Sequence, residues 1–253
     1  MCRMLAKVSS QVSSAEYELL SAPHSLSAQS LKAKLPFADR RCGPHNDGCG
    51  VAWLEDDSLR LKTRGRSGCW DSSFIGLAEN LASTALIAHN RAASPGLVIN
   101  RSAAHPYLGS IAGEQVAFCH NGGIRDLFAQ ASARRVTDSF IFLEHLSREI
   151  HVLDIGSLRG LLAACAKDWS YSSLNGLLLS SRGVFAWRCF EEGGPSGDIN
   201  SGYYTLHIHS RSSGICIASE PVDRKHGWQQ LPNRTLCELR SEGGTVVMRQ
   251  ARF

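Results

Sequence analysis

Residues 1–8 read MCRMLAKV, and this short stretch decides how the rest of the sequence is interpreted. A small residue in second place permits removal of the initiator methionine, so we expect the mature chain to begin at Cys2. Cys2 would then carry a thiol and a free α-amine, whose ordinary pKa values are about 8.5 and about 7.7–8.0. The amine can act, directly or through a water molecule, as the base that activates the thiol. The position of Cys2 alone does not distinguish a catalytic nucleophile from a cysteine without a catalytic role.

The composition is that of an ordinary globular protein. The chain has 253 residues, of which 43% are hydrophobic and 20% charged, with a net charge of +4. No run of basic residues interleaved with aromatics indicates nucleic-acid binding. The apolar stretches are all shorter than the roughly 20 residues that span a bilayer, and no signal peptide precedes Cys2. We therefore expect a cytoplasmic protein with no nucleic-acid or membrane partner.

The nine cysteines do not indicate a disulfide framework. Their number is odd, their spacing is irregular, and no secretory signal accompanies them. No CxxC pair occurs, which argues against a zinc knuckle. Cys119, Cys165 and Cys216 lie within apolar runs and are interpreted as small buried hydrophobes.

Hydrophobic patterning predicts a mixed order of strands and helices. Strands are predicted at residues 2–8, 51–55, 59–63, 84–89, 115–119, 174–180, 184–188, 203–209 and 214–219, with two more near the C-terminus. Helices are predicted from a capping box at Ser13 through Leu20, and at residues 25–35, 72–82, 139–150 and 157–169, with Asp71 and Asp138 as caps. Residues 90–113 are predicted to form a long irregular loop, and such loops are usually functional when they are not disordered. The order favours an α+β domain with two mainly antiparallel sheets.

Polar groups that suit amide chemistry follow two of these strands. Arg91 follows strand 84–89, and its guanidinium can hold a carboxylate by two parallel hydrogen bonds or pair with an acidic neighbour. Asn121 and Gly122 follow strand 115–119 and form either a simple turn or an oxyanion hole, in which each donor is worth about 3–4 kcal/mol. His207 and His209 share one face of a strand, as two metal ligands would, but no third ligand stands nearby in the sequence. We expect no metal and no cofactor.

Taken in order, the short motifs of this sequence resemble those of the class II glutamine amidotransferases of the Ntn-hydrolase superfamily, and the resemblance covers most of the chain. The matching pieces are the N-terminal Cys2, the Asp-Gly segment at 47–52, Arg91 and Ser94, His105-Pro106, His120-Asn121-Gly122 and Thr137-Asp138-Ser139. Residues 218–221 (ASEP), with Trp228 and Pro232, are similar to the C-terminal signature of the short, stand-alone branch, which includes the γ-glutamyl hydrolase of ergothioneine synthesis. Cys49, Tyr107 and Phe140 depart from the family pattern without removing a group that the chemistry requires, though Cys49 and Phe140 could reshape the pocket.

The resemblance implies a four-layer αββα sandwich in which residues 1–253 form a single amidotransferase domain. It implies that Cys2 attacks a γ-carboxamide to give a γ-glutamyl thioester, while Asn121 and Gly122 stabilise the oxyanion. The α-amine of Cys2 would take the thiol proton and pass it to the leaving amine before water hydrolyses the thioester. Substrate binding would fall to Arg91 and Ser94 for the α-carboxylate, to Asp138 for the α-ammonium group, and to His120.

Several functional alternatives stay open on the sequence alone. The sandwich leaves no acceptor domain, so the protein either hydrolyses a small γ-glutamyl amide outright or hands ammonia to a separate synthetase. A protein of another class would be a catalytically silent module of this fold that binds a glutamyl ligand. The joint presence of Cys2, Arg91, Asn121, Gly122 and Asp138 argues against that module. A metal hydrolase built on His207 and His209 is a weaker alternative.

Overall fold

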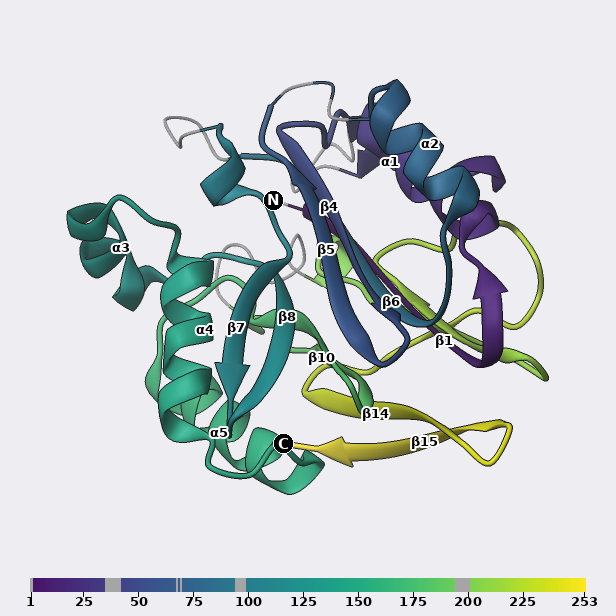
Figure 1. Ribbon diagram of the computed structural model, residues 1–253. Coiled ribbons are helices and arrows are strands. Elements are labelled where there is room, and N and C mark those ends of the chain that lie inside the picture. Colours follow the sequence, from purple (N-terminus) through teal and green to yellow (C-terminus); the bar gives the residue numbers. More distant parts are fainter. Residues whose placement is uncertain (1, 35–41, 67, 69, 94–98, 194–200) are drawn as a thin grey trace.

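The strands form two large antiparallel sheets, shown in the computed structural model of Figure 1, which describes residues 2–34, 42–66, 68, 70–93, 99–193 and 201–253. The seven-stranded sheet has the order β13 (Gln229–Gln230), β11 (His207–Arg211), β12 (Gly214–Ala218), β1 (Cys2–Ser14), β6 (Ala82–Arg91), β4 (Gly48–Glu55) and β5 (Ser58–Arg64). The six-stranded sheet has the order β15 (Thr245–Arg252), β14 (Thr235–Glu242), β10 (Gly183–Arg188), β9 (Asn175–Ser180), β8 (Glu114–Asn121) and β7 (Tyr107–Ile111). A separate short pair joins β2 (Ala33–Lys34) and β3 (Cys42–Gly43).

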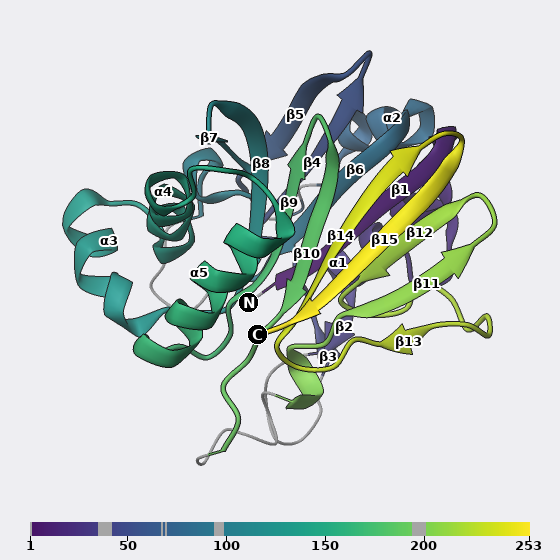
Figure 2. The ribbon, with the colours of Figure 1, turned by 90° about the horizontal axis from the view of Figure 1, so that it is seen from below.

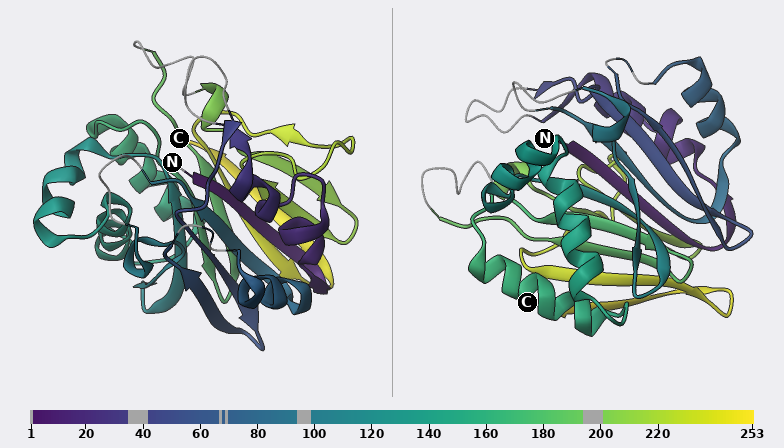
Figure 3. Two further views of the ribbon diagram at one scale, coloured as in Figure 1. Left: turned by 90° about the horizontal axis from the view of Figure 1, so that it is seen from above. Right: turned by 60° about the vertical axis from the view of Figure 1, so that its left-hand side comes forward.

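Helices cover the outer face of each sheet. On one side of the molecule, α4 (Asp138–Glu149) and α5 (Ile155–Asp168) pack on the six-stranded sheet, and α3 (Phe128–Arg134) packs against α4 (Figure 2). The seven-stranded sheet carries the π-helical turn η1 (Tyr17–Ser21), α1 (Leu26–Leu31) and α2 (Ser72–Asn80) on the other side (Figure 3). Two 3-10 turns, η2 (Arg101–Ala103) and η3 (Arg125–Leu127), precede β7 and α3. The expected four-layer αββα sandwich is confirmed.

The alternation of side chains along the strands divides the apolar residues among three interfaces. Between the sheets, Met4, Ala6 and Val8 of β1 pack with Leu177 and Leu179 of β9. The outward side chains of the seven-stranded sheet, such as Leu5 and Val51, pack against Leu19, Leu26 and Phe74. The helices α4 and α5 contribute Phe142, Leu146, Leu158 and Leu162 to the core beneath the six-stranded sheet. Because successive strand residues point to opposite faces, Cys2 shares the inner face with Met4.

Several predicted elements are confirmed with small shifts at their ends. Asp71 caps α2, accepting a hydrogen bond from the Phe74 backbone N–H at 3.1 Å. The hairpin around residues 56–58 joins β4 to β5 through Asp56 and Asp57, both of which have positive φ. Positive φ at both central residues is typical of the two-residue turn that matches strand twist.

Other expectations were wrong in informative ways. β1 runs to Ser14 rather than Val8, and it is succeeded by the short turn η1 in place of a capped helix. α1 ends at Leu31, before the expected residue 35. The loop predicted for residues 90–113 contains the strand β7, which pairs with β8 along Tyr107–Ile111. The helix α3 was not predicted, and β11 begins at His207 instead of residue 203.

The cap of α4 also differs from the prediction. Thr137 is the N-cap, and its side chain accepts from the Phe140 backbone N–H at 3.1 Å. Asp138 is the first residue of the helix, and its carboxylate accepts from the Ile124 backbone N–H at 2.9 Å. The carboxylate therefore turns away from its own helix terminus and toward the chain that follows β8.

Two further properties concern the whole described chain. In its described part, every helix is too short or too polar to cross a lipid bilayer. The seven cysteines whose side chains the structure describes are free thiols, and all seven are buried. Cys165, Cys189, Cys216 and Cys237 have raised pKa values because burial disfavours the thiolate.

Candidate active site

Cys2 lies where the two sheets approach each other. It is the first residue of β1, which runs between β12 and β6, and it pairs in register with Arg91 at the end of β6. Only 7% of Cys2 is exposed. Its backbone nitrogen donates to the Asn121 side-chain oxygen at 3.0 Å. The start of a strand in one sheet is thus joined to the end of a strand in the other.

Arg3 fixes the backbone of Cys2 from behind. The fully buried Arg3 guanidinium donates to the Cys2 carbonyl at 3.0 Å and to the Glu220 carboxylate at 2.6 Å. It also stacks over the Tyr203 ring, 4.4 Å from the ring centroid. The next residue, Met4, donates its backbone N–H to the Ser219 hydroxyl at 3.0 Å. Ser219 and Glu220, which follow β12, therefore bind Met4 and Arg3, the two residues that follow Cys2.

Asn121 and Gly122 present the donors expected of an oxyanion hole. Asn121 is fully buried, and its side-chain nitrogen has no hydrogen-bond partner among the described residues. A buried donor left unpaired costs about 1–3 kcal/mol, so its retention needs a reason. A Cβ on Gly122 would lie 1.8 Å from the Ser173 carbonyl oxygen, so only glycine fits there. The backbone can therefore turn tightly at the end of β8, beside Cys2.

Arg91 and Asp47 belong to one local arrangement at the end of β6. Arg91 is 4% exposed and pairs with Cys2 on one side and Gly48 on the other. The Asp47 backbone N–H donates to the Arg91 carbonyl at 2.9 Å, and its carboxylate accepts from the Ala93 N–H at 2.8 Å. Asp47 thus sets the direction in which the chain leaves Arg91. Ser94, the other residue expected to bind the α-carboxylate, lies outside the described residues.

His120 is already bonded on both sides of its ring. One ring nitrogen is 2.8 Å from the Ser139 hydroxyl and the other is 3.0 Å from the Ser173 carbonyl. These contacts join β8 to α4 and to the segment before β9. Burial lowers the pKa of His120, against the opposing effect of the Asp138 charge. Direct contact between His120 and substrate stays a prediction, while its role in holding the Asn121 turn is visible.

Of the three residues that depart from the family pattern, Tyr107 and Phe140 lie together and Cys49 lies apart. Tyr107 donates to or accepts from Thr137 at 2.8 Å, and its ring meets Phe140 edge-on at 5.5 Å. Both residues therefore pack at the start of α4, next to Asp138. Cys49 is fully buried in the outer core with Val51 and Phe74, on the face of β4 that points away from the other sheet.

The surroundings of Cys2 favour its thiolate. Burial alone would raise the pKa of the Cys2 thiol, but the charges of His89, of the amino terminus and of Arg91, together with hydrogen bonding by His89, lower it to about 6. From the sequence, His89 was placed at the end of a strand and assigned no role. Its spacing offered a signal, because residues two apart on a strand share a face, and His89 stands two before Arg91.

His207 and His209 do not form a ligand pair. The two ring nitrogens of His209 lie 3.1 Å from the His226 carbonyl and 2.9 Å from the Arg211 guanidinium. One nitrogen of His207 lies 3.2 Å from the Ser219 carbonyl. Across the part of the chain that the structure describes, no three His, Cys, Asp or Glu side chains gather as a metal site would require.

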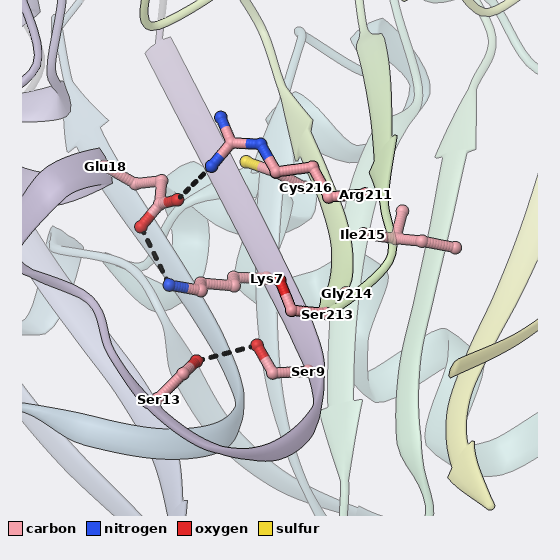
Figure 4. Close-up of a pocket in the computed structure, with 9 residues that line it drawn as sticks. All are labelled: Lys7, Ser9, Ser13, Glu18, Arg211, Ser213, Gly214, Ile215 and Cys216. Carbon is pink, nitrogen blue, oxygen red and sulfur yellow. Dashed lines mark hydrogen bonds and ion pairs between the residues drawn. The ribbon is translucent and has the colours of Figure 1, made fainter. Parts of the chain in front are cut away.

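A hollow lies farther along β1, away from Cys2 (Figure 4). It is lined by Lys7, Ser9, Ser13, Glu18, Arg211, Ser213, Gly214, Ile215 and Cys216. Glu18 accepts from Lys7 at 2.9 Å and lies 3.7 Å from Arg211, so one carboxylate is paired with both basic groups of the hollow. Lys7 stands five residues after Cys2, about 16 Å along an extended strand. This hollow is separate from the Cys2 site.

Comparison with known proteins agrees with this geometry. A family model described as class-II glutamine amidotransferases matches residues 20–194. The gamma-glutamyl-hercynylcysteine sulfoxide hydrolase of Mycobacterium tuberculosis (strain CDC 1551 / Oshkosh) is 28% identical over 252 residues, which cover 98% of this chain and 96% of that protein.

Two solved structures show the same fold. One is the glutamine phosphoribosylpyrophosphate amidotransferase from B. subtilis, with a TM-score of 0.61 and 15% identity, covering 100% of this chain and 49% of that one. This chain therefore spans about half the length of that enzyme. The other is described as a predicted glutamine amidotransferase from Pseudomonas aeruginosa PA01, with a TM-score of 0.57 and 18% identity, covering 97% of this chain and 99% of that one. From its matched residues and its fold, the chain belongs to the class II glutamine amidotransferases.

Proposed function

We propose that the protein cleaves a γ-glutamyl amide with Cys2 as its nucleophile, after removal of Met1. The observation that carries the proposal is that the oxygen and the nitrogen of the Asn121 side chain are available for different tasks. Its oxygen accepts from the Cys2 nitrogen at 3.0 Å, while its nitrogen is buried without a partner among the described residues. After Met1 is removed, the oxygen of Asn121 would orient the Cys2 amine that acts as base, and its nitrogen would donate to the oxyanion that forms next to it.

The chemistry follows from these positions. The Cys2 α-amine takes the proton from the thiol, and the sulfur attacks the carbonyl carbon of the γ-carboxamide. The Asn121 amide and the Gly122 backbone N–H stabilise the tetrahedral oxyanion. As the C–N bond breaks, the proton passes from the α-ammonium group to the leaving amine, and a γ-glutamyl thioester remains. Water then attacks the thioester, releasing glutamate and restoring the thiol.

Two groups of opposite charge would recognise the glutamyl end of the substrate. Arg91, which pairs in register with Cys2, would bind the α-carboxylate with help from Ser94. Asp138, at the start of α4, would bind the α-ammonium group. One of its carboxylate oxygens accepts from the Ile124 N–H, and the other would bind the ammonium group.

The substrate class is supported by the relatives. The M. tuberculosis protein is named for hydrolysis of a γ-glutamyl conjugate, and it matches this chain along nearly its whole length. We therefore favour a small γ-glutamyl conjugate, hydrolysed by residues 1–253 acting as a single domain. Transfer of ammonia to a separate synthetase is the alternative outcome of the same chemistry. The free thiols of the described cysteines support a reducing, cytoplasmic location.

Labelling tests the nucleophile directly. A diazoketone analogue of glutamine should modify Cys2 and leave the other eight cysteines unmodified, and the intact mass should show that Met1 is absent. Cys2→Ser should abolish labelling and reduce hydrolysis of a γ-glutamyl anilide severely, with unchanged thermal unfolding. A label on another cysteine would refute the assignment. A label on Cys2 without hydrolysis would favour the silent glutamyl-binding module.

A further inference from the structure

The steps proposed above for the thioester chemistry do not use the buried pair of imidazole rings beside Cys2. His89 lies on β6 and is fully buried, and His105, which precedes β7, is 2% exposed. Their ring centroids are 4.3 Å apart, and the His105 ring lies 4.4 Å from that of Tyr107. All four nitrogens of the two imidazoles lack a hydrogen-bond partner of good geometry among the described residues. Imidazole carries at least one N–H in either common protonation state, so each ring buries an unpaired donor.

The strand register directs His89 toward the nucleophile. Cys2 pairs with Arg91 and Met4 pairs with His89, so His89 is the diagonal neighbour of Cys2 on the inner face of the sheet. Contact with the tilted His105 ring limits the orientations that the His89 ring can adopt. Gly50 allows His105 to approach, because a Cβ there would lie 2.2 Å from the His105 carbonyl oxygen. The sheet therefore presents one constrained imidazole to the sulfur.

Other groups near Cys2 are less suited to holding a thiolate. The titratable and charged groups within electrostatic reach of Cys2 or the amino terminus are His89 and Arg91 on β6, Tyr107 on β7, Cys119 and His120 on β8, and Arg3, His45, His105, Tyr203 and Tyr204. Burial raises the pKa of Cys119 and of the three tyrosines, which keeps them neutral at pH 7. Burial likewise lowers the pKa of His45 to about 3 and that of His105 well below its usual value.

The two arginines have other partners or tasks. Arg3 donates to Glu220 and to the Cys2 carbonyl, behind the thiol. Arg91 is assigned to the substrate carboxylate in the proposed function, on which this inference rests. We infer that His89 is the hydrogen-bond donor that stabilises the Cys2 thiolate from the sheet side.

This role separates two tasks at the nucleophile. The thiol proton moves to the α-amine, which keeps it for the leaving group, and His89 donates an N–H to the sulfur without a net change in its own protons. His89 thus stabilises the sulfur, whereas the α-amine holds the proton. The effects of His89 on the Cys2 pKa agree with the geometry, since its charge and its hydrogen bond both lower that pKa.

The pH dependence of Cys2 alkylation by iodoacetamide tests the inference without any substrate. In the protein lacking Met1, the rate of Cys2 modification, measured by peptide mass, should rise with pH through a midpoint below the ordinary thiol pKa of about 8.5. In His89→Leu the midpoint should move up by about one unit or more, giving roughly tenfold slower alkylation well below the midpoint and a similar plateau at high pH. His89→Gln, which keeps a donor amide, should retain part of the shift.

His209→Leu is the matched control, because His209 is also a buried histidine on the seven-stranded sheet but is remote from Cys2. Its midpoint should equal that of the parent protein. A His89→Leu profile that superimposes on the parent profile would overturn the inference. If His89→Leu does not fold, a His89→Gln profile shifted upward supports the inference, and a midpoint at least as low as the parent value overturns it.

The two proposals can fail separately. Alkylation that depends on His89, in a protein that hydrolyses no γ-glutamyl amide, would leave this inference standing and refute the proposed function. Hydrolysis of a γ-glutamyl anilide with an unshifted His89→Leu profile would do the reverse. In an active enzyme, His89→Leu should also lower kcat/KM most strongly below pH 7, where the thiolate is scarce.

Discussion

At the scale of the residue, Asn121 combines two tasks that a substitution can separate. Asn121→Asp keeps an oxygen that can accept from the Cys2 nitrogen, but it removes the donor and puts a negative charge beside the developing oxyanion. We expect kcat to fall at least as far as in Asn121→Ala, roughly a hundred- to a thousandfold, with KM almost unchanged. Steady-state kinetics on a γ-glutamyl anilide measures both constants. Near-normal kcat in Asn121→Ala would mean that this turn has no part in the reaction.

The two adjacent glycines after Asn121 provide a matched comparison. A Cβ at Gly122 would lie 1.8 Å from the Ser173 carbonyl oxygen, whereas a Cβ at Gly123 would meet the Phe128 ring at an ordinary 3.4 Å. Gly122→Ala should lower stability by about 1–3 kcal/mol, because the backbone before β9 must move, and it should lower kcat as the oxyanion donor shifts. Gly123→Ala should change either quantity far less. Denaturant titration with activity assays on both variants decides this, and equal losses would contradict the assignment of Gly122 as a close-contact position.

At the scale of the element, the start of α4 places a helix cap and a binding carboxylate side by side. Thr137→Ala removes the cap on the Phe140 N–H and should destabilise the fold by about 1 kcal/mol, with a small effect on KM. Asp138→Asn keeps an oxygen for the Ile124 N–H but loses the charge proposed to bind the α-ammonium group. It should raise KM for a γ-glutamyl substrate with stability nearly unchanged. Thermal unfolding and kinetics measured together test the separation, and the reverse pattern would exchange the two roles.

The strands and helices show which elements the sequence can predict. Buried strands such as β9, and the helices α4 and α5, have strong periodicity and were predicted within a few residues. β7 was missed because Tyr107–Ile111 alternates only weakly and carries Gly109, while its pairing with β8 is a tertiary contact. The Thr137 cap was missed because Asp138 is an equally good capping residue by type. Two contacts separate the two residues: Thr137 accepts from the Phe140 N–H, and Asp138 accepts from the Ile124 N–H.

At the scale of the whole molecule, the site exists only because four layers bring distant segments together. Cys2, Arg91, Asn121 and Asp138 were predicted from the order of short motifs, which identifies the family but contains no distances. The positions of Arg3, His89 and Glu220 could not be assigned in this way. Their roles depend on strand register and on burial, which arise from the pairing of β1 with β6 and β12. The catalytic and binding roles of all these residues remain proposals, each with its own kinetic or labelling test.

The buried Arg3–Glu220 pair is the clearest case in which whole-molecule packing supports the site. Its side chains are 0% and 11% exposed, and the Glu220 carboxylate also lies 2.8 Å from a ring nitrogen of His24, so the pair ties β1 to the residues after β12 and to the chain before α1. Removing one member leaves the other charge buried, which typically costs about 3–5 kcal/mol. We expect losses of that order in Arg3→Met and Glu220→Gln, measured by denaturant titration. The double variant should lose less than the sum of the two.

The exposed pair of Arg60 and Glu55, in the β4–β5 hairpin, is the control for this prediction. Its side chains are 55% and 56% exposed, so the same substitutions there should cost about 0–1 kcal/mol. Arg3→Met should also lower kcat beyond any effect of unfolding, because the guanidinium holds the Cys2 carbonyl. Additive losses in the Arg3–Glu220 double variant would mean that the two side chains act independently. Full kcat in a folded Arg3→Met protein would mean that the Arg3 side chain is not needed to position Cys2.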